Sequence, residues 1–244
     1  MATPGELIKA VADVLHVPEV TISSYYRSLR EAGFVTKGGR GRSAAQMTAA
    51  DAAHLLMAVG GNRFEKESAA KIAEDYRRIR ASHTVRRMAL PTGERPGWLE
   101  GDWIENDAGT WLFEGFSIPH LQALPEQHQF IDALTAVIEA AMNKEFGLAT
   151  YEGSPDAAVS HIIEIYFYGP EPHAGIEIGL SGGGHFFYTE EGTYQLPEKI
   201  GRDPHRSYRE VDEEVSREYG SGDLEIRRKI TFKTIYEIAE LLKS

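Results

Sequence analysis

Two helical segments separated by only three residues constrain the fold of this chain more than any other feature. The first is predicted over residues 4–15, because Thr3 can cap a helix, Pro4 suits its first position and Glu6 can complete a capping box. The second is predicted over residues 19–32, and Gly33 can adopt the left-handed conformation that ends a helix. A turn as short as residues 16–18 then brings the two helices into contact.

Hydropathy patterns over the rest of the chain predict both helices and strands. Apolar residues recur at helical spacing in segments 52–59, 63–83, 126–146 and 235–242. Alternating or short apolar runs predict strands over 103–104, 111–113, 160–168, 175–181, 186–188 and 224–232. The predicted fold class is α+β overall, with an all-α N-terminal domain followed by an α+β domain whose sheet is mainly antiparallel.

Charge is distributed unevenly along the chain. Residues 1–95 hold 15 of the 26 Lys and Arg residues and 10 of the 37 Asp and Glu residues, so the remainder is strongly acidic. The sign changes at Leu90–Gly97, which has the Pro- and Gly-rich composition of a linker. We therefore predict a helical domain with a basic Gly-Arg loop over 1–62, a helix and linker over 63–97, and an acidic α+β domain over 98–244.

Composition excludes several classes of site. The absence of cysteine excludes disulfides, thiolate metal sites and a cysteine nucleophile. No run of 18 apolar residues is available to span a membrane. The first residues also lack the basic and apolar regions of a secretion signal. We expect a cytoplasmic protein with no membrane partner.

Residues 4–35 resemble the helix-turn-helix, winged-helix-like DNA-binding domains of transcriptional regulators. Ala12 lies where that family has a small residue at the helix crossing, and residues 29–35 resemble the end of a recognition helix. His16 occupies a turn position where the family usually has glycine, although histidine tolerates a left-handed backbone. The apolar positions at which the family's helices meet are Leu15, Val17, Ile22 and Tyr25. The resemblance implies a regulator that reads duplex DNA with the 19–32 helix in the major groove.

The resemblance places one face of the 19–32 helix, which also includes Val20, against DNA. Arg27 can bond a guanine edge or a phosphate, while Ser23 and Ser24 are small enough to allow close approach. Glu19 can accept a hydrogen bond from a cytosine amino group, and Thr21 can reach a phosphate. For each of these residues, the alternative is an ordinary solvated helix surface.

A basic loop follows the second helix. Lys37, Arg40 and Arg42 lie in a stretch rich in Gly and Ser, and Arg40-Gly41-Arg42 resembles the core of an AT-hook that enters a minor groove. Ser43 stands where such hooks usually have proline. A solvated loop is the alternative. Arginines on or directly after the predicted 63–83 helix can extend a phosphate footprint or pair with the acidic domain: Arg77, Arg78, Arg80, Arg86 and Arg87.

The function favoured by these patterns is sequence-specific transcriptional regulation with double-stranded DNA as the partner. We expect a homodimer, because one such helix buries little surface and two half-sites increase affinity. The acidic domain is then left for oligomerisation, ligand binding or contact with a protein partner. We expect no cofactor and no metal.

Two alternative functions remain open. In the first, the protein is a transcription adaptor whose acidic C-terminal domain binds a partner with a basic surface. In the second, the C-terminal domain is an enzyme. Ser181–His185 is Gly-rich but lacks the residues of a P-loop and lies between strands, so a turn is favoured. His120, His128 and Asp132 are a weak metal-ligand set, and Glu164 and Glu177 lie on strands that can face each other. We therefore expect no catalytic residues.

Overall fold

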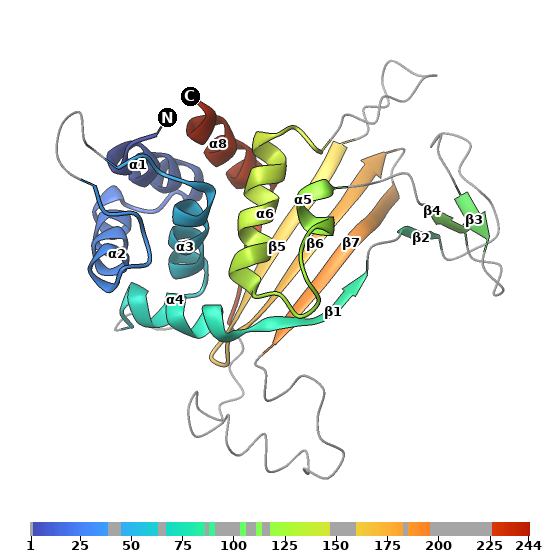
Figure 1. Ribbon diagram of the computed structural model, residues 1–244, viewed down its shortest axis with the longest axis horizontal. Coiled ribbons are helices and arrows are strands. Elements are labelled where there is room, and N and C mark those ends of the chain that lie inside the picture. The colour runs from blue at the N-terminus through green and yellow to red at the C-terminus, as the bar shows by residue number, and fades with distance from the viewer. Residues whose placement is uncertain are drawn as a thin grey trace, which may run out of the picture.

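A computed structural model describes residues 2–38, 45–62, 67–85, 88–90, 103–105, 111–113, 118–146, 160–182, 185–195 and 226–244. Figure 1 shows the order and arrangement of the elements. Their bounds are α1 Pro4–Leu15, α2 Glu19–Ala32, α3 Ala49–Gly60, α4 Ala69–Arg78, β1 Arg80–Val85, β2 Met88–Leu90, β3 Trp103–Glu105, β4 Trp111–Phe113, α5 Pro119–Gln122, α6 Phe130–Met142, β5 Ser160–Gly169, β6 His173–Gly182, β7 His185–Gln195, β8 Ile226–Thr231 and α8 Phe232–Lys243.

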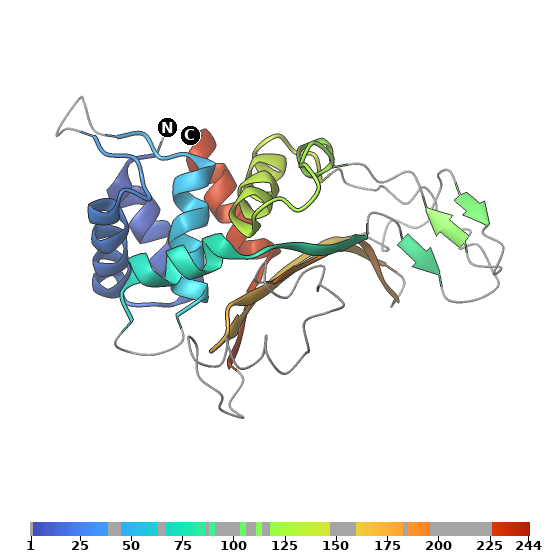
Figure 2. The same cartoon turned by 60° about the horizontal axis from the view of Figure 1, so that its bottom comes forward.

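The fold is α+β, as predicted, and is organised around a five-stranded antiparallel sheet in the order β1-β7-β6-β5-β8. Helices cover one face of this sheet, and α1 to α4 pack together at one side of the molecule (Figures 1 and 2). A separate three-stranded sheet has the order β2-β4-β3, which confirms the predicted pairing of segments 103–104 and 111–113. The two ends of the chain lie side by side, because α1 packs against α8 (Figure 1).

The first two helices form as their local sequence predicts. Thr3 and Glu6 make a reciprocal capping box at the start of α1, and His16 adopts a left-handed conformation with φ 53° in the turn. Gly33 ends α2 with φ 84°, and the amide of Phe34 donates to the carbonyl of Leu29 at 2.9 Å. That bond is the long bond of a Schellman motif, so the predicted glycine cap is confirmed.

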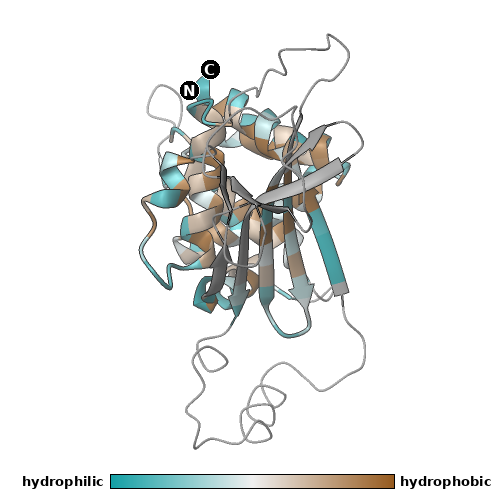
Figure 3. Cartoon of the chain, turned by 90° about the vertical axis from the view of Figure 1, so that its right-hand side faces the viewer, coloured by the Kyte–Doolittle hydropathy of each residue, from teal (hydrophilic) through white to brown (hydrophobic). Residues whose placement is uncertain are grey.

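A continuous hydrophobic core joins the N-terminal helices to the sheet. Helix α3 is buried on almost every side, as expected for a helix that is apolar all round. The ring of Phe167 on β5 lies 5.6 Å from the rings of both Tyr76 on α4 and Phe130 on α6, centroid to centroid. In Figure 3, hydrophobic residues gather where the helices face one another and the sheet. Of the predicted linker at Leu90–Gly97, Leu90 is instead the last residue of β2, and residues 91–97 lie outside the described residues.

Two predicted helices are wrong in extent. The predicted 63–83 helix ends at Arg78, and residues 80–85 instead form β1, which pairs with β7 across more than a hundred residues of sequence. The predicted 126–146 helix begins only at Phe130, because Gln129 and Asp132 form a capping box there. It ends at Met142, and Lys144 has a positive φ. Phe232, predicted at the end of a strand, is the first residue of α8.

Gly60 shows how closely α3 approaches the sheet. A Cβ atom at this position would lie 2.6 Å from two carbons of the Phe167 ring. We therefore expect Gly60→Ala to lower the free energy of unfolding by about 1–3 kcal/mol, because the buried ring would have to shift. Urea unfolding of the full chain would measure this. Gly5→Ala is the matched control, because nothing lies within 4 Å of its added Cβ. Equal stability of the two variants would contradict close packing of α3 on the sheet.

Candidate nucleic-acid interface

Helix α2 is fixed to the rest of the molecule along two of its sides. Ile22, Tyr26 and Leu29 are buried against the core. On the adjoining side, the Tyr25 hydroxyl accepts from Asn62 Nδ2 at 2.6 Å, and Ser28 Oγ accepts from the amide of Ala70 at 3.2 Å. These contacts hold α2 against α3 and the start of α4. They set the orientation of α2 and leave the third side of the helix without such contacts.

That remaining face is exposed and includes most of the predicted contact residues. Glu19, Ser24 and Arg27 are exposed, and Ser23, four residues from both Glu19 and Arg27, is half-buried. Thr21 is half-buried and, being seven residues before Ser28, shares the side of the helix that packs toward α4. The structure therefore brings together Glu19, Ser23, Ser24 and Arg27, and places Thr21 apart from them.

Val20 also lies on this face, where the resemblance placed it without assigning it a particular contact. Its side chain is 77% exposed, and Val20 and Phe232 are the exposed large hydrophobic residues in the described part of the chain. Single exposed apolar residues are common on protein surfaces, so exposure alone means little. Val20 lies, however, one helical turn from Ser24 and seven residues from Arg27, on the same face. The face thus combines an apolar side chain, small hydroxyls, the Glu19 carboxylate and the Arg27 cation.

The start of α2 differs from the start of its neighbours. Side chains of Thr3, Thr48 and Ser68 cap α1, α3 and α4, whereas α2 begins after Pro18 with no side-chain cap. Within the described residues, the amides of Glu19 and Val20 have no hydrogen-bond acceptor. Amides at a helix N-terminus attract anions, because they carry the positive end of the helix dipole. The exposed face therefore begins at two backbone amides that can donate hydrogen bonds to a phosphate.

The basic loop is anchored at both ends by one buried carboxylate. Asp51 is 3% exposed and accepts from the amide and hydroxyl of Thr36 at 2.7 and 3.0 Å. It also accepts from the amide and hydroxyl of Thr48 at 2.8 and 2.9 Å. Lys37, directly after Thr36, is exposed. Arg40 and Arg42 lie outside the described residues, but both ends of their loop are held together beside α2 and α3.

The described arginines predicted on the following helix lie on two different elements, Arg77 and Arg78 on α4 and Arg80 on β1. The guanidinium of Arg77 lies 5.8 Å from the centre of the Phe34 ring. Arg80 is on β1 and donates to the carbonyl of Gln127 at 3.3 Å. Arg86 and Arg87 lie outside the described residues. An extension of the basic surface along one helix is therefore wrong for Arg80, since the helix ends before it.

The residues considered for catalysis or metal binding have structural partners. His128 is buried between the carbonyl of Pro125 and the hydroxyl of Tyr194, each 2.9 Å from a ring nitrogen, whereas His120 pairs with Glu145 and Asp132 caps α6. The described residues contain no group of three His, Asp or Glu side chains able to hold a metal ion. In the segment Ser181–His185, Gly182 on β6 pairs with His185 on β7, and the two residues between them lie outside the described part of the chain.

Glu164 and Glu177 do face each other across β5 and β6, as the sequence indicated. The Glu164 carboxylate accepts from Lys229 Nζ at 2.7 Å and from the hydroxyl of Tyr166. Burial raises the pKa of Glu164, but these hydrogen bonds outweigh it and hold the pKa below its usual value. An ion pair of this kind stabilises a charged carboxylate and gives Glu164 a structural role in the sheet.

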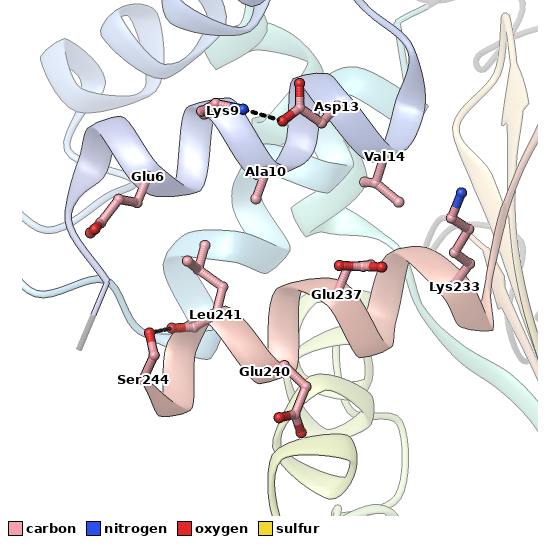
Figure 4. A pocket seen from close by; sticks show the side chains of 10 residues that line it. All are labelled: Glu6, Lys9, Ala10, Asp13, Val14, Lys233, Glu237, Glu240, Leu241 and Ser244. Atoms are coloured by element: carbon pink, nitrogen blue, oxygen red, sulfur yellow. Dashed lines mark hydrogen bonds and ion pairs between the residues drawn. The ribbon is translucent and has the colours of Figure 1, made fainter.

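A second feature lies between α1 and α8, where a groove has a volume of about 620 Å³ (Figure 4). Ala10 and Val14 point from α1 toward α8, and Leu241 points back toward α1. Four acidic and two basic side chains also line the groove: Glu6, Asp13, Glu237, Glu240, Lys9 and Lys233. Lys9 is paired with Asp13, so the lining is acidic on balance.

Comparisons with models of protein families, with curated proteins and with solved structures found no match to this chain. Among the described residues, no helix has the length and apolar character that crossing a membrane requires.

Proposed function

We propose that this protein is a sequence-specific DNA-binding transcriptional regulator that acts as a homodimer in the cytoplasm. Helix α2 enters the major groove through Glu19, Val20, Ser23, Ser24 and Arg27, and the loop containing Lys37, Arg40 and Arg42 contacts the backbone or minor groove. Thr21 lies toward α4 and has no base contact in this proposal.

The observation that carries the proposal is the exposed face of α2. A helix held firmly on two sides, with Val20, two serines and Arg27 on its exposed side together with Glu19, satisfies the steric needs of a major groove. Helix α1 offers Lys9 paired with Asp13, and α3 is almost wholly buried. Among the first three helices, α2 is therefore the best suited to read bases.

A substitution at Val20 tests DNA binding separately from folding stability. We expect Val20→Ser to leave the free energy of unfolding within about 0.5 kcal/mol of the wild type, because the side chain is exposed. Its affinity for a preferred duplex should fall about five- to tenfold, because an apolar contact with a thymine methyl is lost. Fluorescence anisotropy with labelled DNA would measure the dissociation constant.

Lys9→Ala is the control for this test, since Lys9 is exposed on α1 outside the proposed interface. If Val20→Ser and Lys9→Ala bound the preferred duplex equally well, α2 would not contact DNA through Val20. An unchanged affinity for every substitution on the face would remove α2 as the reading helix.

The adaptor remains a second candidate function, favoured by the acidic groove between α1 and α8. Its apolar floor and acidic lining fit an amphipathic helix with basic flanks. An adaptor would bind a partner protein carrying such a helix in the absence of DNA. The double substitution Glu237→Lys with Glu240→Lys would abolish this binding and leave DNA binding intact. If the wild-type protein bound such a partner only when DNA was present, the adaptor function would be contradicted.

A further inference from the structure

A groove separate from the proposed DNA interface lies among α3, α4, α5 and α6. Its volume is about 520 Å³, which is within the range of small-molecule sites. Its apolar lining consists of Ala50, Ala123, Leu124, Ile131 and Ala136. Helices α3 and α4 belong to the N-terminal half of the fold and α6 to the second half, so the groove lies where the two meet.

Two side chains on the N-terminal side of the groove have unused binding capacity. His54 Nδ1 lies 2.9 Å from the carbonyl of Ala50, so this nitrogen carries the proton and Nε2 remains as an acceptor. Burial lowers the pKa of His54, which favours this neutral form. Arg77 also lines the groove, and its guanidinium has no carboxylate partner among the described residues.

The opposite wall offers acceptors on one face of α6. Thr135 and Glu139 are one turn apart and half-buried, and both line the groove. Within the described residues, the Glu139 side chain has no ion-pair partner. Two other polar side chains already have partners, since one oxygen of Asp132 accepts from the amide of Gln129 and His120 is held by Glu145. The groove therefore offers one cation, acceptors on His54, Glu139 and the second oxygen of Asp132, and a hydroxyl around an apolar floor.

We propose that this groove binds a small organic acid bearing a hydroxyl or amino group close to its carboxylate. The carboxylate pairs with Arg77, which is suited to bidentate recognition of oxyanions. An amino group donates to both His54 Nε2 and Glu139, whereas a hydroxyl donates to one of them, and a short alkyl portion lies on the alanines and Leu124. An acid without a hydrogen-bond donor would leave His54 and Glu139 without a partner on the ligand, and a simple amine would leave Arg77 without one.

Phe34 links the groove to α2. Its amide closes the C-cap of α2 on Leu29, and its ring lies 5.5 Å from His54 and 5.8 Å from the Arg77 guanidinium. A ligand that engages Arg77 and His54 competes with the contacts that hold this ring. Ligand binding therefore changes the position of α2. If the proposed function holds, it also changes the affinity of the protein for DNA. By linkage, DNA then changes the affinity for the ligand by the same factor.

Isothermal titration calorimetry of the full chain without DNA tests the ligand site. The probes are L-amino acids and the hydroxy acids lactate, malate and citrate at millimolar concentration. We expect at least one to bind, and Arg77→Ala to weaken that binding at least tenfold. Arg30→Ala, an exposed arginine outside the groove, is the matched control and should bind as the wild type does.

The outcomes separate the ligand site from the proposed function. No binding by any probe, or equal binding by Arg77→Ala and Arg30→Ala, overturns the ligand site whatever the DNA results. Ligand binding by a chain that fails to bind any duplex supports the site and contradicts the regulator. Where both bind, a probe that leaves the dissociation constant for DNA unchanged overturns the coupling through Phe34.

Discussion

Replacing Asp51 with alanine should destabilise the protein by about 3 kcal/mol. The buried carboxylate accepts four hydrogen bonds from Thr36 and Thr48, and hydrogen bonds to a charged group contribute about 1.5–3 kcal/mol each. The loss is smaller than their sum, because water can reach the ends of the loop and replace part of the network. Urea unfolding of the full chain would measure the change.

Asp132→Ala is the matched control for this variant. Asp132 also completes a capping box, but it is exposed and accepts from the amide of Gln129 at 3.0 Å. Loss of an exposed cap costs about 1 kcal/mol. A difference of less than about 1 kcal/mol between the two variants would show that burial and the second threonine add little. Because Asp51 also holds the basic loop together, Asp51→Ala should weaken DNA binding under conditions in which it is still folded.

Replacing Arg27 with alanine should weaken binding to a preferred duplex by about 1–3 kcal/mol, which is about 5- to 150-fold. Discrimination among sequences should fall with it, because Arg27 is the cation among the α2 residues proposed to meet the base edges. Anisotropy titrations against a preferred and a scrambled duplex would measure both effects. Lys9→Ala again serves as the control.

The loop arginines should behave differently from Arg27. Arg40→Ala with Arg42→Ala should weaken both duplexes alike and reduce the salt slope by about 2, because two phosphate contacts are lost. If Arg27→Ala also weakened both duplexes equally, Arg27 would contact only the backbone. Unchanged binding in both variants would contradict the assignment of DNA binding to this part of the chain.

Local signals allowed the first helices to be predicted almost residue by residue. The capping box at Thr3 and Glu6 and the left-handed Gly33 depend only on residues within one turn. Strand β1 was missed because its pairing with β7 joins residues such as Arg80 and Gln195, which no local pattern relates. Tertiary pairing there overrides a helical pattern.

The candidate site was predictable in part. The spacing of Ile22 and Leu29 indicates which side of α2 is buried, and hence that Arg27 is exposed. The position of Thr21 was not predictable, because it depends on contacts that α2 makes with the start of α4. Both ends of the Asp51 network lie within the helical region, yet the contact with Thr36 spans a loop whose path the sequence does not specify.

Selection of duplexes from a random pool by the full chain, at two salt concentrations, tests the central claim most directly. We predict enrichment of a palindromic motif, since two copies of α2 would read two half-sites, and weaker binding of all duplexes at the higher salt concentration. Salt-sensitive binding with no enriched motif would contradict sequence-specific regulation, and no binding at all would contradict a role for this protein on DNA.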